Sequence, residues 1–293
     1  MSAGAALKLR AMRVAYRALN AVVPSVAGRL ATDAFGYTRA LANAPEDRTP
    51  LGAQRFRVAG HSETQEGYVW KGAGATALLV HGWASDSSSM YGFVRPLRSL
   101  GFQVATFDAP AHGISKGKTT TMTRFTHAVK DVLDTLGDVE VIVAHSLGSI
   151  ATVAAVMERG LARAPRCIVL IAPTCTLTEV LERWSASHFA LPRRVVDGIF
   201  AELHKRNGVP VSHWNIVTLG KGLDVPVLVI HDPGDPVVPF CEAERVAASL
   251  PRATLEKAPR LGHVRILSAL DVNNRVTEFI SARAFSLRLK ELA

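Results

Sequence analysis

The chain has 293 residues, of which 48% are hydrophobic, so it can bury a sizeable core and is not disordered as a whole. No apolar run reaches the roughly 18 residues needed to span a bilayer. The formal charge of +9 comes from basic residues scattered along the chain, which does not favour a nucleic-acid partner. The three cysteines are odd in number and include no CxxC pair, which argues against a disulfide framework or a structural zinc site and favours the cytoplasm.

The first 50 residues are predicted to form a basic, amphipathic, helical extension. Residues 1–32 contain five Lys and Arg residues and no acid. Their apolar residues recur at helical spacing: Leu9, Met12, Tyr16, Leu19 and Val23. Charges interrupt every apolar stretch, so a signal peptide is not expected. We prefer a helix packed on the main domain or on a dimer partner; the alternative is peripheral contact with an anionic inner membrane.

Alternating strand and helix patterns follow from residue 51 onward. A hairpin is expected from residues 54–58 and 68–70, and a last strand near 253–257. Five runs between them are apolar throughout, as in strands buried on both faces of a parallel sheet: 77–80, 104–107, 141–144, 167–171 and 227–230. Helical spacing marks residues 125–136, 242–250 and 272–283. The predicted fold class is therefore α/β, with a mostly parallel sheet and helices on both faces.

The segment 174–223 interrupts this alternation. It mixes charges with bulky apolar residues and contains no strand-like run. We interpret it as a helical lid inserted in a core made of residues 51–173 and 224–293, because nearly 50 residues is long for one connection. The alternative is an ordinary pair of crossover helices. If it is a lid, we expect Trp184, Phe189 and Phe200 to line a substrate pocket.

Residues 141–151 carry the first chemical signal. An apolar strand leads into Ser146, and a helix rich in small residues follows. A nucleophilic serine at such a strand–turn–helix junction needs small residues two positions before and after it, because the helix packs close to the strand. Those positions hold Ala144 and Gly148. We therefore predict that Ser146 is a nucleophile.

A hydroxyl nucleophile requires a general base and an acid that orients it. His263 is the one histidine expected on the loop after the last strand, and it is the predicted base. Asp235 and Asp232 both follow the strand 227–230 and compete as the acid; we prefer Asp235, which comes after a Pro-Gly turn. His145 adjoins Ser146, but its side chain is expected to point away from the serine.

The negative charge that develops on a carbonyl oxygen must be met by two backbone N–H groups. One should come from Leu147, at the start of the helix after Ser146. The other should come from Trp83, in the loop after the strand 77–80, where Gly82 allows close approach of the backbone. The Trp83 ring is also a candidate lining of the pocket.

These motifs together resemble the α/β-hydrolase superfamily, and most closely its bacterial esterase-like members with a helical lid. The resemblance spans roughly residues 52–283 and rests on these segments: 80–83, 107–115, 144–148, 231–239 and 262–263. It implies about eight mostly parallel strands and catalysis without metal or cofactor. In such a protein Asp108 and His112 shape a loop. Ala144 and Ala111 depart from the usual pattern, but neither change removes a catalytic group.

The function expected is hydrolysis of a small-molecule acyl ester through an acyl-serine intermediate. A thioester or an amide is a less favoured substrate. An acyltransferase would use the same intermediate with a different acceptor. A protein that binds without catalysis is the alternative from another class, and the intact set of Ser146, Asp235 and His263 argues against it. A serine at position 146 also argues against a dehalogenase, which needs a carboxylate there.

Overall fold

The computed structural model describes residues 14, 19, 23–38, 49–64 and 66–291. Within this range, the side chains of Pro24 and of residues 284–291 are not described. Of the apolar stripe predicted at the N-terminus, Leu9, Met12 and Tyr16 lie outside the described residues. None of the described helices combines the length and the apolar character that crossing a bilayer requires.

One eight-stranded sheet organises the larger part of the chain, in the order β1-β2-β4-β3-β5-β6-β7-β8. The strands are β1 (Gln54–Arg57), β2 (Glu66–Trp70), β3 (Thr76–Val80), β4 (Gln103–Phe107), β5 (Val139–His145), β6 (Cys167–Ile171), β7 (Val227–His231) and β8 (Ala253–Lys257). β2 pairs antiparallel with β1 and β4, and the remaining neighbours are parallel. The prediction of a mostly parallel sheet of about eight strands is confirmed.

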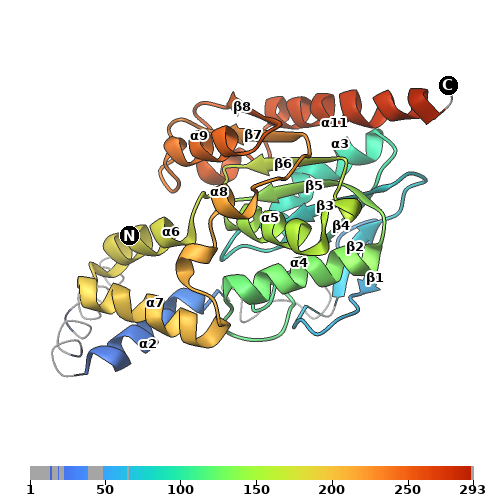
Figure 1. Cartoon of the computed structure of the whole chain (residues 1–293). Coiled ribbons are helices and arrows are strands. Elements are labelled where there is room, and N and C mark those ends of the chain that lie inside the picture. The colour runs from blue at the N-terminus through green and yellow to red at the C-terminus, as the bar shows by residue number, and fades with distance from the viewer. Residues whose placement is uncertain (1–13, 15–18, 20–22, 39–48, 65, 292–293) are drawn as a thin grey trace. The chain divides into compact units, whose positions relative to one another are not determined.

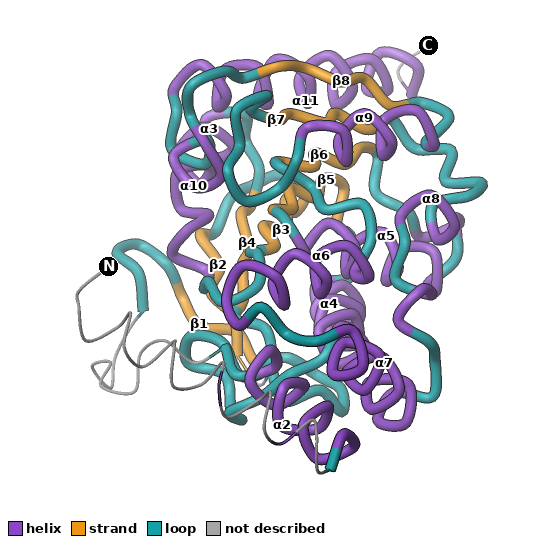
Figure 2. Tube along the Cα trace, turned by 90° about the vertical axis from the view of Figure 1, so that its left-hand side faces the viewer, coloured by secondary structure: helices purple, strands orange, loops and turns teal. Residues whose placement is uncertain are grey.

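Helices cover both faces of this sheet (Figures 1 and 2). On one face, α3 (Val94–Ser99) and α11 (Leu270–Glu291) bury Leu97 and Val276 against strand residues that include Leu79 and Val143. Successive strand residues point to opposite faces. The other face is covered by α4 (Met122–Leu136), α5 (Leu147–Arg159) and α9 (Phe240–Ser249). Because helices cover both faces of the sheet, every residue of the five predicted runs is buried, and the runs are therefore apolar throughout.

Two short α-helices flank the last strands: α8 (Ile216–Leu219) precedes β7, and α10 (Gly262–Arg265) follows β8. Two 3₁₀ helices span Ser87–Phe93 and Leu161–Arg163. The six parallel strands β4, β3, β5, β6, β7 and β8 run in one direction, so their carboxyl ends share one edge. Residues that follow those strands are therefore brought together at that edge.

The chain divides into two compact units: Met1–Tyr37 with Thr176–Asn215, and Thr38–Cys175 with Ile216–Ala293. The first unit holds α2 (Pro24–Gly36), α6 (Leu177–Trp184) and α7 (Arg193–Asn207), with a π-helical turn at Ser185–Phe189. The described residues of the predicted extension up to Tyr37 thus group with residues 176–215 of the predicted insertion, whereas residues 38 and 49–50 and the two ends of the insertion belong to the second unit. The second unit contains the whole sheet.

Within the first unit, α2 packs directly on α7 (Figure 2). The two backbones approach so closely that a Cβ on Gly28 would lie 2.7 Å from the Cα of Gly198. Arg206 of α7 forms an ion pair with Asp33 of α2 at 2.6 Å. Ala27 and Ala31 of α2 are fully buried. In the described range, the N-terminal segment therefore contributes a structural helix to this unit.

Candidate active site

Ser146 sits at the sharp turn between β5 and α5. Its backbone has φ 52° and ψ −126°, a left-handed conformation that is strained for a side chain with a Cβ. The turn is fixed by a hydrogen bond from the Ser146 N–H to the Ile171 carbonyl at 3.1 Å. Position 148 must be glycine, because a Cβ there would lie 2.3 Å from the His81 carbonyl oxygen. The predicted junction of strand, turn and helix is present.

The structure brings Ser146, His263 and Asp235 together. Nε2 of His263 lies 3.0 Å from Oγ of Ser146, and Nδ1 of His263 lies 2.7 Å from Oδ2 of Asp235. His263 lies 117 positions after Ser146 and 28 positions after Asp235 in the sequence. The three residues meet because each follows a parallel strand. The Asp235 side chain is fully buried, and the His263 side chain is 11% exposed, so His263 remains accessible to a ligand.

Asp235 is held as a carboxylate. Burial alone would raise its pKa, but hydrogen bonds from His231 and His263 hold the pKa well below its usual range. Its second oxygen, Oδ1, accepts the N–H groups of Val237 at 2.7 Å and Val238 at 3.1 Å. Both oxygens are therefore occupied, which fixes the direction in which Oδ2 faces His263.

Asp232, the competing acid, performs a different task. Its Oδ1 accepts the Gly234 N–H at 2.8 Å, and its Oδ2 accepts the N–H groups of Leu261 at 2.7 Å and Gly262 at 2.5 Å. Burial would raise the pKa of this carboxyl, but these backbone bonds outweigh it and lower the pKa. Asp232 thus ties the loop after β7 to the loop that carries His263.

His145 contacts the candidate base, which the sequence analysis missed. Its ring lies 4.7 Å from the ring of His263, measured between centroids, and its Nε2 is 3.0 Å from the His263 carbonyl oxygen. Because a carbonyl only accepts, Nε2 carries the proton. Burial, and then repulsion by His263, lowers the pKa of His145 to about 3, so the ring is neutral. No sequence pattern signals this contact across 118 positions.

The loop after β3 lies against the serine. A Cβ on Gly82 would lie 2.9 Å from Nδ1 of His145 and 3.1 Å from Cβ of Ser146, closer than ordinary contacts, so glycine lets the loop approach Ser146 closely. The Trp83 ring packs edge-on against His112, with centroids 5.7 Å apart. Leu147 opens α5, and the first N–H groups of a helix have no partner within it. The N–H groups predicted to meet an oxyanion are therefore on segments that adjoin Ser146.

Two buried histidines brace this loop. Nε2 of His112 accepts the N–H of Ala84 at 3.0 Å, and Nε2 of His81 accepts the N–H of Ala109 at 3.0 Å. The Nε2 atoms of His81 and His112 must therefore carry no proton. Burial accordingly lowers the pKa of His81, and burial followed by repulsion from His81 lowers the pKa of His112 to about 3. Ala84 is held at φ 54°, which sets the path of the backbone after Trp83.

Asp108 joins the two loops at this edge. Its Oδ1 accepts the Ser87 N–H at 2.7 Å and its Oδ2 the Ile114 N–H at 2.9 Å. Its carbonyl accepts the hydroxyls of Thr64 and Ser115. These contacts agree with the loop-shaping role that the family resemblance implied.

The aromatic residues predicted to line the pocket lie in both units. Trp83 is half-buried in the second unit. Trp184 and Phe189 belong to the first unit, where Trp184 packs edge-on against Phe189 at 5.2 Å and against Phe35 at 5.3 Å. Phe200 is half-buried on α7. A role of these residues in substrate binding remains a prediction.

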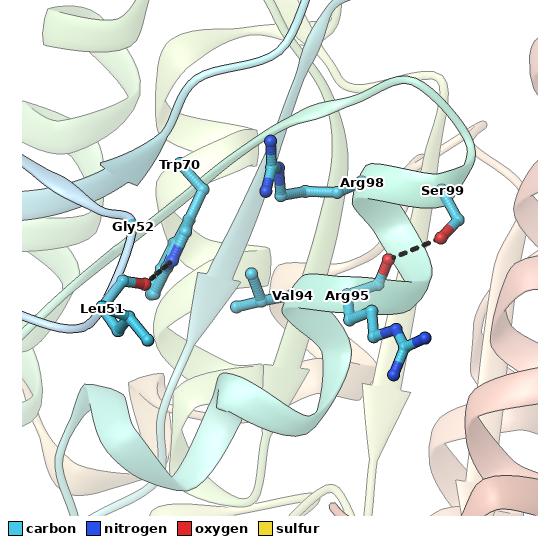
Figure 3. Close-up of a pocket in the computed structure, with 7 residues that line it drawn as sticks. All are labelled: Leu51, Gly52, Trp70, Val94, Arg95, Arg98 and Ser99. Carbon is cyan, nitrogen blue, oxygen red and sulfur yellow. Dashed lines mark hydrogen bonds between the residues drawn. The ribbon is translucent and has the colours of Figure 1, made fainter.

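A surface pocket of about 350 Å³ lies at a different edge of the sheet (Figure 3). It is lined by Leu51, Gly52, Trp70, Val94, Arg95, Arg98 and Ser99. Trp70 pairs with Val104 near the start of β4, so the pocket lies opposite the edge that carries Ser146. Figure 3 shows Arg98 turned toward Trp70 and Arg95 turned away. The pocket contains no group that resembles an activated nucleophile or base.

The described part of the chain shows no metal site, and two of its three cysteines are buried. No three His, Cys, Asp or Glu side chains gather there as metal ligands. Burial raises the pKa of the Cys167 thiol to about 12, which leaves it protonated and inert. Cys175 is also buried.

A parallel sheet with a strained serine after β5, and with an acid and a histidine on later loops of the same edge, defines the α/β-hydrolase class. The sequence matches the Alpha/beta hydrolase family over residues 77–275, and the chain belongs to that family. It is therefore a hydrolase by fold and family. No curated protein matches the chain.

Solved structures agree with this fold. The esterase Pf2001 of Pyrococcus furiosus is 20% identical, with a TM-score of 0.59 and coverage of 82% of this chain and 97% of its own. The mouse alpha/beta hydrolase domain-containing protein 10 is 17% identical, with a TM-score of 0.59 and coverage of 82% and 99%. A serine hydrolase involved in carbazole degradation is 18% identical, with a TM-score of 0.54 and coverage of 74% and 95%.

Proposed function

We propose that this protein is a serine hydrolase that cleaves small carboxylic esters through an acyl-serine intermediate. The observation that carries the proposal is the continuous contact from Ser146 Oγ to His263 Nε2, at 3.0 Å, and from His263 Nδ1 to Asp235 Oδ2, at 2.7 Å. A serine hydroxyl is a weak nucleophile by itself, and a base at hydrogen-bond distance that is oriented by a carboxylate activates it.

In the first half of the reaction, Oγ of Ser146 attacks the ester carbonyl carbon and its proton passes to Nε2 of His263. The bond to the leaving alcohol then breaks, and the alcohol takes the proton from His263. In the second half, His263 removes a proton from water, which attacks the acyl-serine. The bond between the acyl carbon and Oγ then breaks, Oγ takes the proton from His263, and the products are a carboxylic acid and free Ser146. Asp235 stabilises the imidazolium that forms twice in this cycle.

The oxyanion of each tetrahedral intermediate would be met by the N–H groups of Leu147 and Trp83. The Leu147 N–H lies at the first position of α5, where the helix dipole favours negative charge. The close approach of Gly82 to Ser146 supports the same role for the loop that carries Trp83. Removing one such donor in a serine protease costs about 10²- to 10³-fold in kcat.

The acyl side of the substrate is proposed to contact Trp83, and the prediction that Trp184, Phe189 and Phe200 bind it is tested separately. Single alanine variants of the last three, assayed with p-nitrophenyl esters of increasing chain length, test this assignment. We expect the ratio of kcat/KM between long and short esters to change. An unchanged chain-length profile in all three variants would leave Trp83 and the loops of the second unit as the pocket.

The activity itself is tested by steady-state hydrolysis of the same ester panel. We expect turnover by the wild-type protein and its loss in Ser146→Ala, by about a million-fold when a nucleophile of this kind is removed. Thermal unfolding should show that the variant is folded. Retention of more than a few per cent of turnover would exclude Ser146 as the nucleophile. Adding an alcohol or amine and measuring the ratio of acid to transfer product separates a hydrolase from an acyltransferase.

A further inference from the structure

Asp235 is in contact with a second histidine, which the triad does not include. His231 is the last residue of β7 and is fully buried. Its Nε2 lies 3.0 Å from the Val238 carbonyl oxygen and 3.4 Å from Oδ2 of Asp235. The same Oδ2 lies 2.7 Å from Nδ1 of His263. One carboxylate oxygen therefore lies between two imidazole rings.

The position of the proton on His231 follows from its neighbours. Nε2 faces two oxygen atoms that only accept, so it carries a proton and donates. Nδ1 is buried and has no hydrogen-bond partner among the described residues, so a proton at that atom would be buried without a partner. The ring is thus a donor through Nε2, which points at the Val238 carbonyl and at the Asp235 carboxylate.

The contacts of His231 close a small ring of interactions around the acid. Asp235 Oδ1 accepts the N–H groups of Val237 and Val238, while the Val238 carbonyl accepts from His231. The ring of His231 is itself fixed by packing edge-on against Phe240, with centroids 5.7 Å apart. Loss of the His231 N–H would free both the Val238 carbonyl and one side of Oδ2.

We propose that His231 is a positioning residue of the Ser146–His263–Asp235 group, which holds the Asp235 carboxylate toward His263 and takes a share of its charge. The proposal rests on the proposed function, since it concerns the acid of that site. It separates His231 from the residues that contact substrate: the side chain is buried behind Asp235 and acts through it.

The proposal has two consequences for catalysis. A carboxylate that is less well fixed orients His263 less well, so kcat should fall more than KM rises. Without the His231 donor, the negative charge on Oδ2 stabilises the His263 imidazolium more strongly. The acid limb of the plot of kcat/KM against pH should therefore move to higher pH. The titratable groups that face His263 and His231 are Asp235, His145 and, across the Phe240 ring, Lys257. A substitution at position 231 leaves the side chains of His145 and Lys257 unchanged.

The test compares His231→Gln with His231→Met in the full-length protein. The two new side chains are close in size and flexibility, but only glutamine can donate an N–H in place of the imidazole. We expect His231→Met to lose about ten- to a hundredfold in kcat and His231→Gln to recover most of it. Phe240→Leu loosens the packing of the His231 ring but leaves its N–H in place, so it should lose less kcat than His231→Met.

A double-mutant cycle decides whether His231 acts through Asp235. In an Asp235→Asn background, His231→Met should change the residual kcat by less than about twofold. An equal loss in both backgrounds, or equal losses for the Gln and Met variants, would assign His231 a structural role only and overturn the proposal. If the Met variant does not fold, His231→Leu takes its place in the cycle.

A readout without turnover separates this proposal from the function on which it rests. Proton NMR detects the shared proton between His263 Nδ1 and Asp235 Oδ2 as a far-downfield resonance. We expect this resonance to shift in His231→Met and to remain near its wild-type position in His231→Gln. A resonance unchanged in both variants would contradict the proposal. A wild-type protein that shows the resonance but hydrolyses no ester would refute the proposed function instead.

Discussion

The contact between Gly148 and the loop after β3 gives a quantitative prediction for Gly148→Ala. An added Cβ would lie 2.3 Å from the His81 carbonyl oxygen, whereas an ordinary van der Waals contact begins at 3.4 Å. The helix and the loop must therefore separate by about 1 Å, the difference between these two distances. Because His81 is followed by Gly82 and Trp83, the separation moves a proposed oxyanion donor relative to Ser146.

A displacement of about 1 Å in a catalytic arrangement can cost on the order of 10²-fold in rate. Overpacking of a tight interior contact costs about 1–3 kcal/mol of stability. We expect Gly148→Ala to lower kcat by about a hundredfold at nearly constant KM, and to lower the free energy of unfolding by that amount. Stopped assays with a short p-nitrophenyl ester and urea unfolding measure the two effects.

Ser149→Ala is the matched control, in the next position of the same helix. Ser149 is fully buried, and its hydroxyl has no hydrogen-bond partner in the described part of the chain, so alanine removes an unpaired polar atom and adds nothing. Its activity and stability should remain near wild type. If Gly148→Ala behaves like this control, the close approach to His81 does not set the position of the loop, and the reasoning is refuted.

Two further predictions concern the acids and the buried histidines. Asp235→Asn should lower kcat by about 10⁴-fold through loss of histidine orientation, while Asp232→Asn should cost far less activity and act mainly on stability; the reverse ranking of kcat would make Asp232 the acid. Stability should also fall with acid. His112 and His145 have pKa values near 3 in the folded protein against 6.5 in the unfolded chain, so below pH 6.5 the unfolded chain binds more protons. The stability that these residues contribute is present above pH 6.5 and is lost toward pH 3, by about 1.4 kcal/mol per pH unit for each histidine. Urea unfolding at pH 7 and pH 5 measures this loss, and equal stability at the two pH values would contradict it.

The fold was accessible from the sequence because its signals are local. Uninterrupted apolar runs mark the strands that are buried on both faces, and helical spacing marks α4, where Phe125, Val129, Val132 and Leu133 are buried. The order of Ser146, Asp235 and His263 along the chain also follows a pattern that this class shares. Parallel pairing then brings residues after different strands to one edge, whatever their separation in sequence.

The contacts made by the other histidines were not accessible in this way. His145, His231 and His112 each bond to a group whose position depends on how a loop folds. The spacing of a histidine along the chain carries no information on which ring nitrogen faces a carbonyl or a carboxylate. The grouping of α2 with α7 depends similarly on the close approach of Gly28 and Gly198, two glycines that have no distinguishing pattern in sequence.

Covalent labelling of Ser146 tests the central claim most directly. A fluorophosphonate reacts with a serine only when a base activates it, so the wild-type protein should gain the mass of one phosphonyl group, located on the peptide that contains Ser146. Ser146→Ala should gain none, and His263→Gln should react far more slowly. An unlabelled wild-type protein that is shown to be folded, or a label on any other residue, would contradict the assignment of Ser146 as an activated nucleophile.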